Sequence, residues 1–322
     1  MKVYHTMQQV EQQPELAAGS SVALGFFDGI HTGHQAVIGA AVEYAKAHGL
    51  APALFTFTLP LNSTMKGGRL MDETSKHRLM AQLGVQHYIE PAFEAVCSYT
   101  PRQFVEEILH RQCRARAVFC GENFTFGKQA AGDIDTLRTL CEPLGIQVVV
   151  VSMTTYQCRL VSSTRIRAAL AEGDMESIRT MLGRPYSICF PVQHGQGLGR
   201  TLGFPTINQI YPAGFAQPRY GIYITRVRIG EDWYAGATGF GTRPTVNQSG
   251  EGATCETFIP GFEGQLYDQQ LEVEFYHYLA PSQRFNSLQE LADCVNNAAR
   301  KTLEYFAQNP PKQPNRNASF YL

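Results

Sequence analysis

The sequence has no long hydrophobic run. None of its 322 residues lies in a stretch that approaches the roughly 18 uninterrupted apolar residues of a membrane-spanning helix. The first residues, MKVYHTMQQVEQQPELAAGS, also lack the apolar segment of a secretory signal. We therefore expect a cytoplasmic protein that makes no contact with a membrane.

An excess of one charge is absent as well. Lysines and arginines number 27 against 28 acidic residues, a formal net charge of -1, and no long run of one sign occurs. Proteins that bind nucleic acid or anionic lipid carry a basic patch or stripe. The composition therefore predicts no nucleic-acid partner, and any phosphate must be bound locally.

Paired cysteines are missing too. The 8 cysteines are scattered along the chain without a CxxC pair. In a chain of this length such a distribution is typical of reduced thiols and favours neither a disulfide framework nor a zinc site.

The sequence pattern changes near residue 184, which divides the chain into two parts. The first part alternates short apolar runs with segments of helical period, and strands that alternate with helices predict βαβ units around a parallel sheet covered on both faces. A last helical stretch covers 162–183, so the first domain is predicted to span 1–184. The apolar runs are 21–25, 51–57, 87–90, 116–121 and 145–152, and the helical segments are 34–49, 72–84, 100–112 and 133–145.

The second part is rich in glycine and proline and reads as short strands between turns, which predicts an antiparallel β-barrel or sandwich. A helix over 287–306 should pack one apolar face on it. The second domain is predicted to span 185–310, and 311–322 to form a flexible tail. The strand-like runs are 186–192, 221–229, 233–239, 255–259 and 271–279, and the apolar face of the helix consists of Leu288, Leu291, Val295, Leu303 and Phe306.

The stretch LGFFDGIHTGHQ, residues 24–35, combines a glycine-rich loop with two histidines. It reads as the end of a buried strand, a loop, and a helix that begins near Gly33. His31 and His34 then lie where the carboxyl edge of a parallel sheet meets a helix N-terminus, which is a site for phosphate. Imidazoles add hydrogen bonds or positive charge there. The alternative is a pair of ordinary loop histidines.

A second polar stretch, LVSSTRIRAAL at 160–170, precedes another helix. The hydroxyls from Ser162 to Thr164 suit an N-cap. Arg165 and Arg167 are suited to hold a triphosphate or pyrophosphate, because a guanidinium supplies directional donors together with charge.

These two stretches together resemble the nucleotidyltransferase superfamily. With FVEEIL (104–109) and GENFTFG (121–127) between them, they are similar to the FMN adenylyltransferase module of the bacterial bifunctional riboflavin kinase/FAD synthetase family. The resemblance implies a Rossmann-like first domain in which the phosphate of FMN attacks the α-phosphorus of ATP, giving FAD and pyrophosphate.

The resemblance also implies roles for individual residues. His31, His34 and Arg167 would act on the phosphates during the reaction. One departure is that TFTLPLNS (56–63) replaces a Pro-His-Pro found in many relatives. The remaining residues matched to ATP are Gly25, Phe27, Asp28, Gly29, Gly33, Ser163, Thr164 and Arg165, and those matched to flavin are Asn123, Phe124 and Phe126.

The β-rich part contains GQGLGRTLGFPTIN at 195–208, which reads as a glycine-rich flap followed by an extended segment. It resembles the Gly-Phe-Pro-Thr-x-Asn motif of riboflavin kinases, and the likeness continues through most of 220–291. The resemblance implies a riboflavin-kinase-like barrel that uses Mg²⁺ and ATP. Thr206 and Asn208 would hold the metal and the phosphates, Gly197 would contact ATP, and Glu256 would be the general base for the riboflavin hydroxyl.

This part also departs from the kinase pattern. Phe258 replaces a histidine, and Gly239 stands where relatives carry Asn or Ser; the other departures are Asp268, Ala280 and Ser282. The leading hypothesis is a bifunctional enzyme that converts riboflavin to FMN and FMN to FAD. The alternatives are an FAD synthetase with a degenerate or altered-substrate kinase domain, and a flavin-binding protein without turnover.

Overall fold

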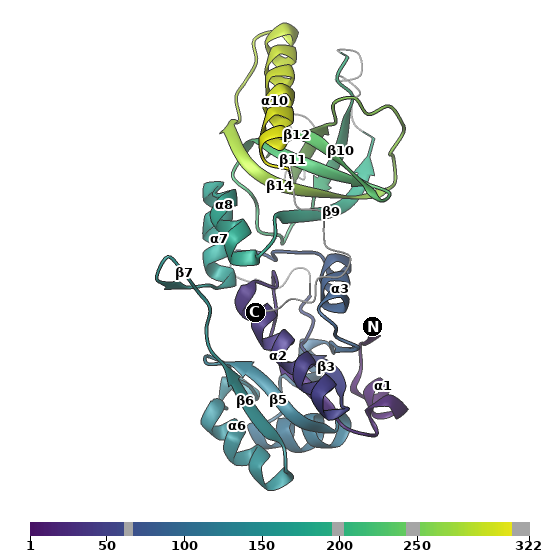
Figure 1. Ribbon diagram of the computed structural model, residues 1–322, viewed down its shortest axis with the longest axis vertical. Coiled ribbons are helices and arrows are strands. Elements are labelled where there is room, and N and C mark those ends of the chain that lie inside the picture. The colour runs from purple at the N-terminus through teal and green to yellow at the C-terminus, as the bar shows by residue number, and fades with distance from the viewer. Residues whose placement is uncertain (61–66, 195–202, 243–251, 311–322) are drawn as a thin grey trace. The chain divides into compact units, whose positions relative to one another are not determined.

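The computed structural model describes residues 1–60, 67–194, 203–242 and 252–310 (Figure 1). The chain divides into two compact units, which we describe separately. The first consists of Met1–Arg167 with Thr180–Gly183, and the second of Ala168–Arg179 with the chain from Arg184 onward. The chain therefore passes between the units more than once, and its last passage adjoins the domain boundary predicted after residue 184.

The first unit is built on a six-stranded parallel sheet, as the alternation of strands and helices predicts. Short β1 at its edge is not among the predicted strands. The strands lie in the order β1 (Lys2–Tyr4), β4 (His87–Ile89), β3 (Ala51–Phe55), β2 (Ser20–Leu24), β5 (Ala115–Gly121) and β6 (Gln147–Val151).

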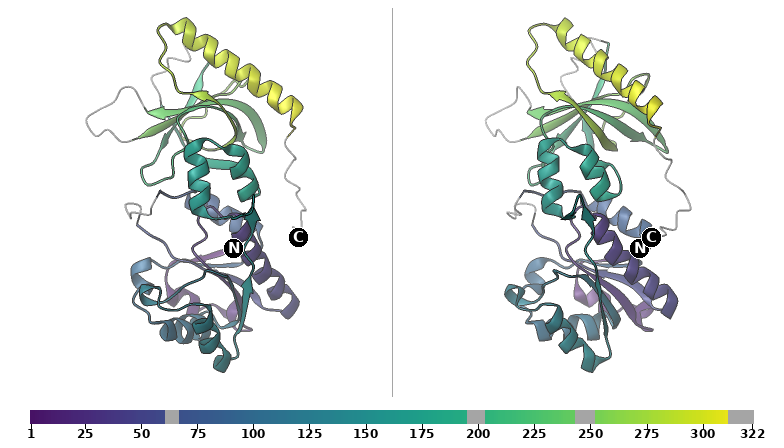
Figure 2. Two further views of the ribbon diagram at one scale, coloured as in Figure 1. Left: turned by 90° about the vertical axis from the view of Figure 1, so that its left-hand side faces the viewer. Right: turned by 60° about the vertical axis from the view of Figure 1, so that its left-hand side comes forward.

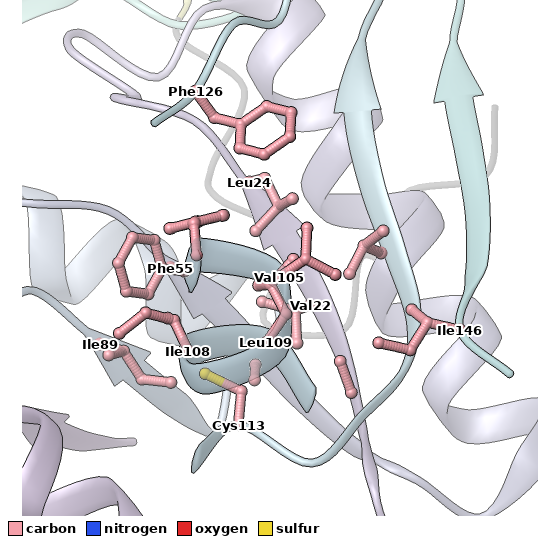
Figure 3. Packing of buried hydrophobic residues seen from close by; sticks show 14 of the residues in the cluster. Val22, Leu24, Phe55, Ile89, Val105, Ile108, Leu109, Cys113, Phe126 and Ile146 are labelled. Carbon is pink, nitrogen blue, oxygen red and sulfur yellow. The ribbon is translucent and has the colours of Figure 1, made fainter. Parts of the chain in front are cut away.

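Both faces of this sheet are buried. Val22 and Leu24 point into one apolar cluster, whose packing is drawn in Figure 3, and Ala23 between them points into the other. Because both faces are covered, β2 is buried along its whole length rather than at alternate residues. The covering helices are α1 (Met7–Glu11), α2 (Thr32–His48), α3 (Glu73–Gln82), α4 (Phe93–Val96), α5 (Pro101–Gln103), a π-helix (Phe104–Gln112) and α6 (Ile134–Cys141), with short 3₁₀ turns at Pro14–Leu16, Lys128–Ala130 and Glu142–Leu144.

The strand order fixes where a ligand can bind. From β2 the chain goes to one side to form β3 and β4, and it later returns to the other side of β2 to form β5. Ligands of open α/β sheets bind at the carboxyl ends of the strands where the order reverses in this way. The loop after β2 occupies that position.

The helical stretch predicted over 162–183 consists of two helices, α7 (Ser163–Glu172) and α8 (Met175–Leu182). Gly173 interrupts it with a φ of +77°. Asp174 then starts α8 by accepting a hydrogen bond from the N–H of Ser177 at 3.0 Å. A short hairpin, β7 (Thr155–Tyr156) with β8 (Arg159–Leu160), precedes α7 and is not predicted from the sequence.

The second unit is a closed antiparallel barrel, which confirms the predicted architecture. Residues along β9 alternate between inside and outside, with Tyr186, Ile188, Phe190 and Val192 buried. The strands follow each other around the barrel in the order β10 (Thr206–Tyr211), β13 (Ala253–Phe258), β12 (Asp232–Thr242), β11 (Gly221–Ile229), β14 (Gln270–Pro281) and β9 (Tyr186–Gln193).

The terminal helix α10 (Leu288–Gln308) lies across the outside of the barrel (Figure 2). Its predicted apolar face is only partly correct. Leu288 and Leu303 are 54% and 50% exposed, whereas the buried positions are the small residues Ala298, Ala299 and Thr302. The helix approaches β11 and β12 closely enough that small side chains fill the contact. Within the described ranges, no helix combines the length and the apolar character that a membrane crossing requires.

Candidate active sites

The loop between β2 and α2 has an unusual backbone. Phe27 and Ile30 adopt left-handed φ angles of +56° and +43°, which non-glycine residues rarely do. Both side chains are buried, at 1% and 0% exposure, so packing holds the strained turn in place. Gly25 is required beside them, because a Cβ there would lie 2.9 Å from the ring of Phe27. Such strain is typical of functional loops.

The two histidines of the loop are stacked on each other. α2 begins at Thr32, close to the predicted position, and His31 is its N-cap: Nδ1 of His31 accepts the backbone N–H of His34 at 3.3 Å. The ring centroids are 3.6 Å apart, and Phe27 packs edge-on against His34 at 5.3 Å. Because Nδ1 accepts, a neutral His31 carries its proton on Nε2 and presents a donor there.

Burial sets the charge of His34. It lowers the pKa of His34 well below its usual range, and the neighbouring His31 and Lys76 act in the same direction. His34 is therefore neutral at pH 7 and does not supply the positive charge that the sequence allowed. Its Nδ1 is buried and has no hydrogen-bond partner within the described parts of the chain.

Asp28 joins the two motifs that are far apart in the sequence. Its backbone oxygen accepts the hydroxyl of Ser163 at 2.8 Å, and its carboxylate forms an ion pair with Arg167. The same carboxylate accepts the N–H of Leu70 at 3.0 Å, and Arg167 donates to the oxygen of Gly68 at 2.7 Å. Burial raises the pKa of the Asp28 carboxyl, while Leu70 and Arg167 oppose that shift.

The other residues of the second motif have different surroundings. Ser162 caps α7 as expected, since its hydroxyl accepts the N–H of Arg165 at 3.3 Å. Thr164 is exposed in the first turn. The side chain of Arg165 instead donates to the carbonyl oxygens of Tyr156 and Arg159 in the β7–β8 hairpin, at 2.7 and 3.0 Å. The expected phosphate role of Arg165 is therefore not supported, because hairpin carbonyls occupy its guanidinium.

Lys76 on α3 is a member of the site that the sequence analysis misses. It is 6% exposed, and its ammonium donates to the oxygen of Phe26 at 3.4 Å. Burial lowers its pKa. It lines a cavity of about 20 Å³ together with Asp28 and Arg69. The spacing of Lys76, Met80 and Leu83 on one helix face is the signal that points to its burial.

A larger cavity of about 430 Å³ lies elsewhere, lined by residues such as Lys2, Ala51 and His87. These residues begin β1, β3 and β4, so this cavity is at the amino ends of the strands, opposite the edge where α/β sheets bind ligands. We do not assign the site to it.

The three residues matched to flavin do not share one environment. Asn123 is exposed after β5 and Phe124 is half-buried. Phe126 is 6% exposed, stacks on Phe124 at 5.8 Å and lies in the apolar cluster with Phe104 (Figure 3). Core packing covers most of the Phe126 ring, so its contact with flavin stays a prediction. The half-buried rings of Phe26 and Phe57, 5.1 Å apart near the ends of β2 and β3, are aromatic neighbours that the sequence analysis does not single out.

The kinase residues lie on the outer face of the barrel. Asn208 on β10 pairs directly with Glu256 on β13, and the amide of Asn208 donates to the hydroxyl of Thr206 at 3.5 Å. Glu256 is exposed between two buried residues, as strand alternation requires. Gly239 on β12 flanks Glu256 from the other side, and a Cβ there would meet only a backbone oxygen at 3.9 Å. The predicted ATP contact Gly197 lies outside the described residues.

The packing of Phe258 accounts for one departure from the kinase pattern. Its ring meets Phe204 edge-on at 6.3 Å and packs with Ala237 and the small residues of α10. The residue that replaces the polar histidine thus belongs to an apolar contact of the barrel.

Comparison with known proteins matches both units. A family model for FAD synthetase matches residues 13–165, and one for riboflavin kinase matches 182–306. The bifunctional riboflavin kinase/FMN adenylyltransferase of Bacillus subtilis (strain 168) is 31% identical over 317 residues, which covers 95% of this chain and 99% of the relative. The chain belongs to the bifunctional riboflavin kinase/FMN adenylyltransferase family.

Other members of this family are similar to the chain over most of its length. The enzyme of the same name from Pseudomonas fluorescens is 32% identical, with 86% of this chain and 90% of the relative covered, and that of Escherichia coli (strain K12) is 29% identical, with 97% and 100% covered. A crystal structure described as a macrolide-efflux protein from Streptococcus pneumoniae superposes with a TM-score of 0.81 at 24% identity, covering 94% of this chain and 98% of that one. At that identity the likeness concerns the fold.

The family membership confirms the function predicted from the motifs. The protein is an FMN adenylyltransferase and a riboflavin kinase. The FAD synthetase match falls within the parallel-sheet unit, and the riboflavin kinase match covers the barrel.

Proposed function

We propose that adenylyl transfer to FMN takes place at the carboxyl end of β2, where the 25–30 loop meets the start of α7. The observation that carries this proposal is the double contact of Asp28 with Ser163 and Arg167. It brings a helix N-terminus from each motif to one edge of the sheet, where backbone N–H groups and the helix dipole favour phosphate.

The chemistry asks for orientation and charge stabilisation more than for a protein nucleophile. A phosphate oxygen of FMN forms a bond to the α-phosphorus of ATP, the bond from that phosphorus to the bridging oxygen breaks, and pyrophosphate leaves with the electron pair. His31 donates from Nε2 to a phosphate oxygen. Gly33 keeps the phosphates' approach open, because a Cβ there would lie 3.3 Å from the His31 ring.

His34 and Arg167 have different roles in this scheme. The buried, neutral His34 supports the His31 ring and has an unsatisfied nitrogen close to the phosphates. An arriving phosphate raises the pKa of His34, since an opposite charge favours the protonated form. Arg167 acts as a positioning residue, because its guanidinium holds Asp28 and the backbone of Gly68.

We further propose that riboflavin is phosphorylated on the outer face of β10 and β13. The 5′-hydroxyl oxygen attacks the γ-phosphorus of ATP, the hydroxyl proton passes to the carboxylate of Glu256, and ADP leaves. Thr206, Asn208 and Glu256 present a hydroxyl, an amide and a carboxylate along one face. These oxygen donors fit Mg²⁺, which would neutralise charge on the ATP phosphates. Both reactions use ATP, which supports a cytoplasmic location for the protein. Its partners are then the small molecules riboflavin, FMN and ATP.

Separate feeding of the two flavins tests this proposal. Purified protein is incubated with Mg-ATP and either riboflavin or FMN, and the flavins are separated by chromatography. FAD from both substrates is expected. Omission of Mg²⁺, with a chelator present, should stop both reactions, and FAD formed without a divalent ion would contradict the metal assignment.

A second candidate keeps only the adenylyl transfer, with a kinase unit of lowered or altered activity. The apolar packing of Phe258 and the bare flank at Gly239 favour it. In the same assay it gives FAD from FMN and no FMN from riboflavin.

A further inference from the structure

A cluster of acidic residues and histidines lies in the first unit beside the proposed adenylyl site. Glu73 and His77 are one turn apart on α3, and Glu90 directly follows β4. One possible ligand atom from each of these residues lies within 4.8 Å of the others. His5, just after β1, reaches the same carboxylate, with Nδ1 3.4 Å from Oε1 of Glu90. Three distant segments therefore converge here.

Glu90 is the centre of this cluster and is almost fully buried. Its side chain is 2% exposed. Nε2 of His77 lies 2.9 Å from Oε1, whereas Oε2 has no hydrogen-bond partner in the described chain. Oε2 of Glu73 is likewise buried without a hydrogen-bond partner in the described chain. A buried carboxylate with an unsatisfied oxygen is costly unless a donor or a cation meets it.

Neighbouring groups supply only part of the hydrogen bonds and positive charge that these buried carboxylates require. The buried hydroxyl of Tyr88 lies beside Glu90, and Glu90 and Glu73 add to the burial that raises the pKa of Tyr88. The guanidinium of Arg69 donates to Oε1 of Glu73 at 3.3 Å, and the ammonium of Lys76 donates to the backbone of Phe26. The exposed His5 leaves one side of the cluster open to solvent.

We propose that Glu73, His77 and Glu90 bind a divalent transition-metal ion of the zinc class, with His5 as a further ligand. Imidazole and carboxylate are the mixed donor set that such ions take in proteins. Ligand atoms about 2.1 Å from zinc are about 3.4 Å apart at tetrahedral corners and about 3.0 Å apart at octahedral corners. The separations of 3.4 and 2.9 Å around Glu90 match these edges.

The metal would take the place of the hydrogen bond between His77 and Glu90 and bring positive charge to the buried carboxylates. It would link edge strand β1, helix α3 and the end of β4, which are three segments far apart in the sequence. This role is structural and independent of the catalytic Mg²⁺.

Cobalt is a suitable probe, because Co²⁺ occupies zinc sites and gives visible absorption bands whose strength reports coordination number. The full chain, freed of metal and without nucleotide, is titrated with Co²⁺ and then with Zn²⁺. One equivalent of Co²⁺ should bind with strong visible bands, and Zn²⁺ should displace it. Zn²⁺ should also raise the Tm of the wild type, because it binds only the folded chain.

Variants decide whether these residues are the ligands. Glu90→Gln and His77→Ala should each weaken Co²⁺ binding at least tenfold and abolish the Zn²⁺ shift in Tm. His48→Ala and Glu94→Gln, which change exposed residues of α2 and α4, should bind as the wild type does. His5→Ala alters a side chain that is 65% exposed and tests the cluster without a risk to folding.

Absence of a visible Co²⁺ spectrum in the wild type would overturn the proposal. Equal binding by the wild type, His77→Ala and His5→Ala would also overturn it, because the metal would then lie elsewhere. In either case the cluster would be held by its protein contacts, such as those of Glu90 with His77 and of Glu73 with Arg69. Neither result bears on flavin turnover, which is measured separately.

Discussion

Asp28 and Glu256 are the acidic residues of the two proposed sites, and the protein holds them in opposite ways. Asp28 is 7% exposed and bonded to an arginine 139 residues away, with a further contact to Leu70. Glu256 is exposed and is placed by strand pairing with Asn208 and Gly239. Tertiary contacts between distant side chains build the first site, whereas strand register places Glu256 beside Asn208 and Gly239 in the second.

This difference predicts how each site fails. Removing a member of a buried ionic network leaves an uncompensated charge, so both stability and activity are lost. Removing an exposed carboxylate from a barrel strand leaves the fold intact, because surface substitutions away from special features change stability by less than about 0.5 kcal/mol. The following changes probe that contrast.

The largest effect is expected for Arg167→Met. Loss of the guanidinium leaves the Asp28 carboxylate buried without its partner, which should cost about 4 kcal/mol of stability and remove FMN adenylylation. Urea unfolding and the FAD assay measure the two effects. Asp28→Asn combined with Arg167→Met should regain part of the stability without regaining activity. Full stability in the single variant would show that the ion pair does not hold the loop.

Glu256→Gln should lower riboflavin phosphorylation by about 100-fold or more, because the amide cannot accept the hydroxyl proton. Its thermal unfolding should match that of the wild type, since the side chain is exposed. Asn208, directly opposite, offers the matched change Asn208→Ala, which should weaken ATP binding. Phosphorylation at the wild-type rate by Glu256→Gln would exclude the base assignment.

The pH dependence of stability should carry a contribution from His34. Its pKa in the folded protein is below the unfolded value of about 6.5, so the unfolded chain takes up the proton first and stability falls as pH drops below that value. Between pH 7 and 5 the wild type should lose more stability than His34→Gln in urea unfolding. Equal losses would mean that His34 titrates normally.

The smallest effect is expected at Gly239. Among the described residues only a backbone oxygen lies near a Cβ at this position, so Gly239→Ser should fold with stability within about 0.5 kcal/mol of the wild type. The new side chain would lie beside Glu256 and should alter the KM for riboflavin by less than tenfold, with FMN adenylylation unchanged. A stability loss of several kcal/mol would show that this flank of the barrel is packed.

The sequence was sufficient for the features that local rules determine. The β2 strand, the turn and the N-terminus of α2 follow from apolar runs, glycines and caps, so His31 and His34 are placed correctly. The alternation around Glu256 follows from strand period in the same way.

Features that depend on contacts between residues far apart in the sequence could not be predicted from the sequence. No local signal shows that hairpin carbonyls occupy Arg165, or that core packing covers Phe126. The close approach of Ala298 to the barrel likewise depends on the partner element. Edge strand β1 has three residues and no periodicity to detect.

The central claim is that each unit carries its own reaction, with the adenylyl site at the end of β2. The most direct test is the flavin assay with His34→Ala, given riboflavin or FMN with Mg-ATP. The account predicts that this variant makes FMN from riboflavin at the wild-type rate and forms FAD about 100-fold more slowly from either flavin. FAD at the wild-type rate, or loss of riboflavin phosphorylation in a folded variant, would contradict it.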